Sequence, residues 1–117
     1  CNEVRHFFEK QVDELSQYGE QNIILDPGIG FNKSMNSNFE LLKNIKDYRI
    51  DNLPVLIGIS RKSIIYKTLK ITAQEALNGT TVLNTIAVLN GANILRVHDV
   101  KEAVEVVKLV GRMKNEE

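Results

Sequence analysis

The sequence predicts an α/β fold in which parallel strands alternate with crossover helices. Three short, continuous apolar runs, at residues 22–25, 54–59 and 93–97, are typical of strands buried on both faces. Helical periodicity fills the stretches between them, and each stretch is long enough for a right-handed crossover. Because no low-complexity segment or linker interrupts the chain, we expect no domain boundary inside it.

The first two helices are expected on either side of the first strand. Residues 3–18 carry apolar side chains at intervals of three and four, and Gly19 supplies a left-handed stop. Ser37 and Glu40 have the spacing of a capping box. We therefore expect a second helix that starts there and continues through Tyr48.

The segment after the second strand is predicted to hold a short helical turn over residues 60–69 and then a longer helix. Thr72 and Glu75 form another capping box, and the helical pattern leads down to Gly91. An interruption or bend is expected near Gly79, because glycine is a poor helix former.

The last helix is expected to follow the third strand. Asp99 is placed to cap it. Its apolar stripe is predicted to comprise Val100, Ala103, Val107 and Val110.

Composition narrows the classes of function. Fifteen Lys and Arg balance fifteen Asp and Glu, so no overall field favours nucleic acid or a membrane, and charge chemistry must be local. The single cysteine, Cys1, offers no internal disulfide, metal quartet or redox pair, which favours a reducing, cytoplasmic setting. No apolar stretch approaches the ~20 residues that span a bilayer. The lack of a starting Met suggests a segment of a longer chain.

Every unusual polar cluster lies just after a predicted strand. The three clusters are Asp26-Pro-Gly-Ile-Gly-Phe31, Ser60-Arg-Lys-Ser63 and Arg96-Val-His-Asp-Val100. Ligands bind at the carboxyl ends of strands in parallel α/β proteins. Three clusters on one edge therefore predict one site.

The first cluster offers a carboxylate and two glycines. Asp26 matches a heterocycle whose ring N–H and amino group present two donors, but an aspartate that caps a turn before proline fits equally well. Gly28 and Gly30 let a ligand approach the backbone, although two such glycines are a weak signal alone. Gly58, inside the second strand, also indicates close approach of the backbone to a ligand.

The other two clusters supply cations. The Lys62 ammonium and the N–H groups of the short helix that follows could converge on negative charge or a ring carbonyl, but charge alone favours two solvated cations, Arg61 and Lys62, on a loop. Arg96 and His98 alternate along a strand, so both face one side and together suit a phosphate or pyrophosphate. Taken alone, His98 reads as a structural histidine, and His6 is assigned to a solvent-exposed helix surface.

No nucleophile with an adjacent base, paired catalytic carboxylates or histidine cluster with metal spacing is present in the sequence. The segment is therefore expected to supply electrostatic binding and orientation. In order and separation, the three clusters resemble the last three strand-and-helix units of the dihydropteroate synthase family. The resemblance runs from about Asn22 to near the end of the chain. It implies the C-terminal part of a TIM (β/α)8 barrel, with the barrel incomplete within residues 1–117.

The resemblance implies an enzyme that joins a pterin methyl pyrophosphate to p-aminobenzoate and releases pyrophosphate, a step of folate biosynthesis. It assigns pterin binding to Asp26, Lys62 and Arg96, and pyrophosphate binding to Arg96 and His98. Lys62, Arg96 and His98 would be the catalytic set. Phe31 would line the p-aminobenzoate pocket.

Ser63 would hold the carboxylate of the aminobenzoate. The implied mechanism is dissociative: pyrophosphate leaves, and the aminobenzoate nitrogen attacks a cation-like methylene carbon. One departure from the family is Asn32, where many members have glycine. Asparagine tolerates a left-handed backbone better than most residues.

The resemblance also implies Mg²⁺, held by a loop of the parent that this chain lacks, so no metal is expected on the chain itself. The segment alone is expected to be inactive and to form dimers or higher oligomers. Two other interpretations remain open: a pterin-binding methyltransferase domain, and a non-catalytic phosphate-binding α/β module. The second predicts complete strand pairing within the chain.

Overall fold

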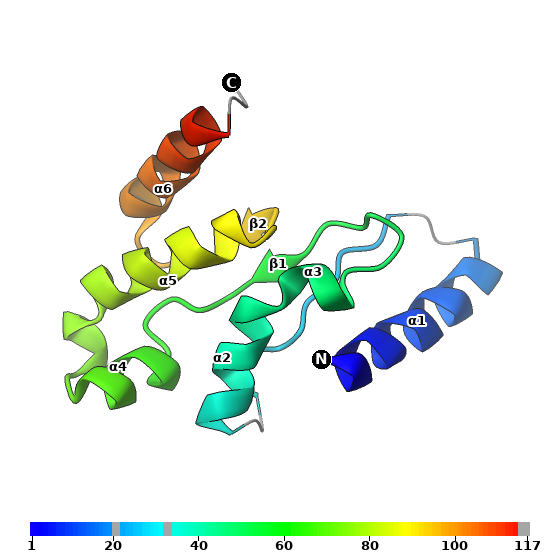
Figure 1. The fold of residues 1–117 in the computed structure, drawn as a ribbon, viewed down its shortest axis with the longest axis horizontal. Helices are drawn as coiled ribbons and strands as arrows, with labels where there is room; N and C mark the ends of the chain where they lie inside the picture. The colour runs from blue at the N-terminus through cyan, green and yellow to red at the C-terminus, as the bar shows by residue number, and fades with distance from the viewer. Residues whose placement is uncertain (20–21, 32–33, 115–117) are drawn as a thin grey trace.

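The computed structural model describes residues 1–19, 22–31 and 34–114 as a flat body with extents of 44 × 36 × 20 Å. Helix α1 lies at one end, and α4 and α6 lie toward the other, with β1 and β2 between them (Figure 1). The elements, in order, are α1 (Asn2–Gln17), α2 (Met35–Lys43), α3 (Ile45–Tyr48), β1 (Leu56–Ile57), α4 (Ser63–Leu69), η1 (Ala73–Glu75), α5 (Leu77–Leu89), β2 (Ile94–Leu95) and α6 (Val100–Met113).

The predicted parallel pairing is confirmed, but the strands are shorter than expected. β1 and β2 pair in parallel with Leu56 opposite Ile94, and Leu25 forms an isolated parallel bridge with Val55. Residues 22–24 therefore lie outside any regular strand. Within the described residues β1 has neighbours on both sides, whereas Leu25 and β2 each pair on one side only. Pairing therefore lapses after a few residues.

The core forms around β1 and the helices that cover it. The side chains of Val55, Ile57 and Ile59 are fully buried, and Tyr48 is buried beside them. The Tyr48 hydroxyl donates to the Leu41 carbonyl oxygen at 2.8 Å, so the burial leaves no unpaired phenol. Burial, with a smaller contribution from the negative charge of Asp26, raises the pKa of Tyr48.

The structure corrects the predicted start of the second helix. Ser34, not Ser37, caps α2: its Oγ accepts from the Ser37 backbone N–H at 3.1 Å. The Glu40 carboxylate accepts instead from the Asn44 side chain at 2.9 Å. The expected continuous helix divides at Asn44 into α2 and α3, so the 37–40 capping box was wrong.

The Thr72–Glu75 capping box is confirmed, although it opens the 3₁₀ helix η1 rather than α5. The helical stretch that begins at Thr72 is interrupted at Ala76, three residues before Gly79, and α5 itself runs unbroken through Gly79 from Leu77 to Leu89. A Cβ at Gly79 would lie 2.5 Å from Ile65 Cγ2. The glycine therefore allows α5 to pack closely against α4.

The apolar stripe predicted for α6 is half right. Ala103 and Val110 are buried together with Val106, but Val100 and Val107 are 63% and 51% exposed. The buried line faces α5, the helix against which α6 packs. None of the described helices is long and apolar enough to cross a membrane.

Candidate functional site

The ends of the strands converge on a small cavity of about 120 Å³. It is lined by Gly58, Ser60, Lys62, Arg96, Val97 and His98. The first cluster reaches the same place, because Asp26 Oδ2 lies 3.6 Å from Arg96 Nη1. The structure therefore brings together the three clusters that the sequence placed on one edge.

Lys62 reaches across this edge from the second cluster to the first. Its Nζ donates to the Ile29 carbonyl oxygen at 2.6 Å and lies 4.8 Å from the centre of the Phe31 ring. Gly30, at φ +89°, leaves room for the stem, since a Cβ there would lie 3.2 Å from Lys62 Cδ. Burial lowers the pKa of Lys62, the positive charge of Arg96 lowers it further, and Asp26 opposes the shift.

Arg96 lies flat against the end of β1. A Cβ at Gly58 would lie 2.5 Å from Arg96 Nη2, so only glycine permits this placement. The close approach predicted at Gly58 is therefore made by the Arg96 guanidinium. Asp26 accepts from the Gly28 backbone N–H at 2.9 Å through Oδ1, which is the turn geometry that the sequence left open. Its contact with Arg96 is half exposed, and such pairs contribute little to stability.

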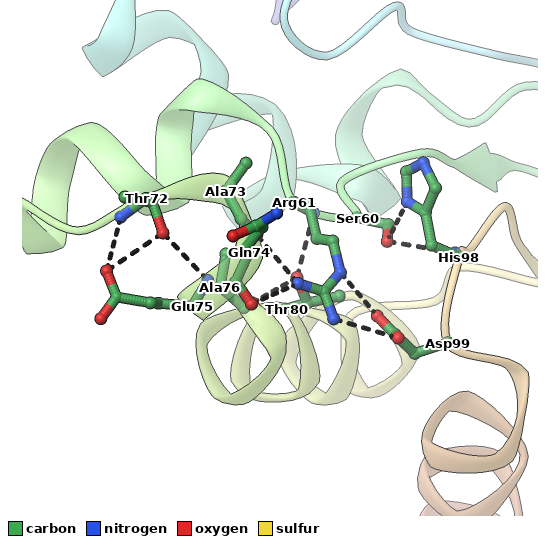
Figure 2. Close-up of polar contacts among 10 residues, drawn as sticks. All are labelled: Ser60, Arg61, Thr72, Ala73, Gln74, Glu75, Ala76, Thr80, His98 and Asp99. Atoms are coloured by element: carbon green, nitrogen blue, oxygen red, sulfur yellow. Dashed lines mark hydrogen bonds and ion pairs between the residues drawn. The ribbon is translucent and has the colours of Figure 1, made fainter.

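His98 is held by Ser60. The Ser60 Oγ lies 2.7 Å from His98 Nδ1 and also accepts from the His98 backbone N–H at 3.2 Å (Figure 2). Ser60 is 5% exposed, so this hydroxyl is shielded from bulk water.

The residues proposed to hold an aminobenzoate both adjoin Lys62. Phe31 lies under its ammonium group and is 60% exposed, and Ser63 is the first residue of α4, directly after the Lys62 N-cap. Both positions are open to a ligand in this geometry. Asn32 lies outside the described residues. His6 is solvent exposed on α1 and lies 3.7 Å from Glu9, as expected.

Comparison with known proteins identifies the architecture. The profile of the pterin binding enzyme family matches residues 1–98. The chain belongs to this family. The dihydropteroate synthase of Escherichia coli strain K12 is 41% identical over 110 residues, covering 92% of this chain, and that of Synechocystis is 41% identical over the same length.

Solved structures agree with this membership. The Yersinia pestis dihydropteroate synthase superposes with a TM-score of 0.92 at 34% identity over 97% of this chain, and the Coxiella burnetii enzyme does so with a TM-score of 0.92 at 31% identity. The chain spans 39% of the E. coli relative and 55% of the Y. pestis chain. It therefore corresponds to part of a pterin-binding enzyme.

Arg61 does not line the cavity at the strand ends. Its guanidinium makes a two-pronged pair with Asp99, at 2.9 and 3.1 Å, and donates to the carbonyl oxygens of Ala73 and Gln74 (Figure 2). Its backbone N–H donates to Thr80 Oγ1. Arg61 is therefore not the solvated loop cation that charge alone favours.

Asp99 shows the matching departure from expectation. It occupies the N-cap position of α6 but makes no side-chain capping hydrogen bond, because its carboxylate is engaged by Arg61. The hydrogen bond from Arg61 lowers the pKa of Asp99, burial opposes the shift, and the positive charge of Arg61 lowers the pKa further. Sequence reasoning also missed Ser60 as the partner of His98; the only local signal was its place at the end of a buried strand.

Proposed function

We propose that this chain is the C-terminal part of a dihydropteroate synthase, comprising the last three strand-and-helix units of a (β/α)8 barrel. The observation that carries the proposal is the convergence of Lys62, Arg96 and His98 on one cavity. These side chains come from two different strand ends, and Asp26 adds a carboxylate from a third. The identity to the E. coli synthase supports the same assignment.

The exposed apolar surface supports a larger barrel. A groove of about 380 Å³ between β2 and α6 is lined by Leu95, Val97, Val100, Ala103, Val104, Val107 and Lys108. At the opposite edge of the sheet, next to Leu25, the Ile24 side chain is 52% exposed. A full barrel needs about 250 residues, and its remaining strands and helices would cover these surfaces. In residues 1–117 alone these surfaces stay uncovered, which supports the proposal that the isolated segment forms dimers or higher oligomers.

In the proposed reaction the bond between the pterin methylene carbon and a pyrophosphate oxygen breaks, and its electron pair leaves with the pyrophosphate. A bond from the aminobenzoate nitrogen to that carbon forms, and the nitrogen loses a proton. Arg96 and His98 would stabilise the charge on the departing oxygens, as preorganised donors do when charge develops. Asp26 and Lys62 would hold the pterin ring.

The second substrate would occupy the side of Lys62 where Phe31 and Ser63 lie. Phe31 offers an exposed ring face, and Ser63 begins a helix next to a cation, which suits a carboxylate. The Yersinia pestis synthase has been solved in complex with a sulfonamide drug, so a member of the family accepts such a ligand. We propose that the parent of this chain binds p-aminobenzoate in the corresponding place.

Magnesium does not fit the described residues by themselves. Among them, no three His, Cys, Asp or Glu side chains gather closely enough to hold a metal ion. Any Mg²⁺ used by the parent would therefore take its ligands from outside the described segment. We expect the parent to work in the cytoplasm, where a lone reduced cysteine such as Cys1 is usual.

The two other interpretations are less well supported. A methyltransferase domain needs no aminobenzoate pocket, whereas Lys62 lines the cavity with the Phe31 ring beside its ammonium group. An independent phosphate-binding module predicts complete strand pairing, whereas the described residues contain a two-stranded sheet with a bridge at one side.

The proposal is tested by assaying the full-length parent with the pterin pyrophosphate and p-aminobenzoate. We expect dihydropteroate and pyrophosphate to appear in equal amounts, and residues 1–117 alone to give no product. Absence of product from the folded full-length protein would overturn the proposed activity. Turnover by the isolated segment would instead show that the remaining barrel is dispensable.

A further inference from the structure

We propose that Ser60 is a positioning residue that holds neutral His98 in the tautomer with its proton on Nε2. The ring then presents an N–H donor to the cavity. The tautomer follows from the hydrogen bonds of Ser60 alone. Its use, donation to the departing pyrophosphate, rests on the proposed function.

The assignment follows from counting protons around the Ser60 hydroxyl. A backbone N–H can only donate, so the 3.2 Å contact from the His98 N–H uses Ser60 Oγ as an acceptor. The hydroxyl proton still needs an acceptor, because Ser60 is 5% exposed and native structures rarely leave a buried donor unpaired. Among the described residues, the group in contact that can accept it is His98 Nδ1, at 2.7 Å.

The opposite assignment leaves a proton without a partner. If His98 Nδ1 carried the proton, it would donate to Ser60 Oγ, and the hydroxyl would accept twice while its own proton had no acceptor among these contacts. With the hydroxyl donating to Nδ1, both groups are satisfied. The neutral ring must then carry its proton on Nε2.

The free ring nitrogen is well placed for use. Figure 2 shows the second nitrogen of His98 pointing away from Ser60. His98 lines the cavity together with Lys62 and Arg96, so its Nε2 N–H would add a directional donor beside two positive charges. The carboxylate of the next residue, Asp99, is paired with Arg61. Asp99 therefore does not compete for the ring.

Neighbouring contacts hold the same turn. Ser60 binds His98 and Arg61 binds Asp99, so two consecutive residues after β1 tether two consecutive residues before α6. This double tether fixes the backbone that carries the imidazole. Ser60 has the separate role of setting the tautomer of the His98 ring.

The test is a long-range ¹H–¹⁵N correlation spectrum of the full-length parent labelled with ¹⁵N-histidine, recorded at a pH where imidazole is neutral. The His98 signal is assigned by its loss in His98→Gln. We expect the pattern of an Nε2-protonated ring in the wild type and in Ser60→Thr, which keeps the hydroxyl. Ser60→Ala should shift the ring to a mixture of tautomers. An Nδ1-protonated wild-type ring overturns the proposal, whether or not any variant folds.

Binding of inorganic pyrophosphate gives an independent readout. We expect Ser60→Ala to bind it roughly tenfold more weakly and Ser60→Thr to bind it within about twofold of the wild type, because one hydrogen bond to a charged group is at stake. Equal affinity of Ser60→Ala and the wild type would remove the positioning role. A wild-type protein that shows the Nε2 tautomer but no pyrophosphate affinity would leave the tautomer standing and contradict the proposed function.

Discussion

Arg61 and Lys62 are adjacent and carry the same charge, yet they face opposite sides of one turn. The Arg61 guanidinium donates four hydrogen bonds, two of them to Asp99, and so fastens the loop to η1 and α6. Lys62 instead donates to Ile29 and lies over Phe31 at the cavity. The backbone separates them, because Arg61 is left-handed at φ +54° and the chain reverses before α4 begins.

The difference shows that two adjacent side chains of the same charge can serve different purposes. Arg61 has the planar fork that suits a carboxylate and two carbonyls, and its donors are spent within the protein. Lys62 is a compact ammonium with three donors, of which the described contacts use one. The structure therefore predicts that Arg61 governs stability and that Lys62 governs activity.

The largest expected effect comes from removing the cation at the cavity. In the full-length parent, Lys62→Ala should lower kcat/KM on the order of 1,000-fold, because a group at the reacting centre is lost from a preorganised site. Lys67→Ala, an exposed change on the same helix, is the control and should stay within about twofold. Steady-state assays measure both, and thermal unfolding should show little difference between them. Equal activities of the two variants would remove Lys62 from the site.

A somewhat smaller effect is expected from displacing the neighbouring cation without deleting it. Gly58→Ala puts a methyl group where Arg96 Nη2 now lies, so the guanidinium must move. A shift of about 1 Å costs on the order of 100-fold in rate. The same change in an Arg96→Ala background should have little further effect, because the clashing group is already gone. Additive losses in this double-mutant cycle would show that Gly58 acts through something other than Arg96.

The sequence predicted the fold because its signals there are local. Short, continuous apolar runs and their spacing indicate buried parallel strands, and polar clusters after each run indicate the functional edge. It could not predict where the runs stop pairing, since pairing depends on which residues of distant segments lie opposite one another, as Leu25 does with Val55 and Leu56 with Ile94.

The candidate site was predictable as a set of residues but not as a geometry. The pairs Ser60–His98 and Arg61–Asp99 join positions 38 residues apart, and no local sequence pattern predicts such pairs. Capping rules pointed to Asp99 as a cap, but a bidentate arginine competes for the same carboxylate and wins. The N-cap of α2 is Ser34 rather than Ser37 because the backbone is extended at Ser34. The sequence does not show at which serine the backbone is extended.

The Arg61–Asp99 pair should appear as a pH dependence of stability. The hydrogen bond from Arg61 lowers the folded pKa of Asp99, so the folded state binds that proton less readily than the unfolded chain. The contribution is therefore fully present above the unfolded value of about 4 and is lost as pH falls through the lower, folded value. The stability difference between wild type and Asp99→Asn, from urea midpoints, should shrink over that range. Glu105→Gln, an exposed carboxylate on α6, is the control, and a difference that does not vary with pH would contradict the pairing.

The smallest expected effect tests whether the support under Arg61 can be weakened without touching the cavity. Both carbonyl oxygens that the Arg61 guanidinium binds, those of Ala73 and Gln74, belong to η1, which begins at the capping box of Thr72 and Glu75. Thr72→Ala removes the hydroxyl that accepts from the Glu75 backbone N–H, and loss of such a cap costs about 1 kcal/mol. Denaturant unfolding of the full-length parent should show that loss, with kcat/KM within about twofold of wild type, because Lys62 makes its contacts with Ile29 and Phe31 on the other side of the turn. Thr72→Ser keeps the hydroxyl and should restore the stability. A large loss of activity in Thr72→Ala with the fold intact would mean that the Arg61 contacts and the cavity are one mechanical unit, and the division between the two cations would have to be abandoned.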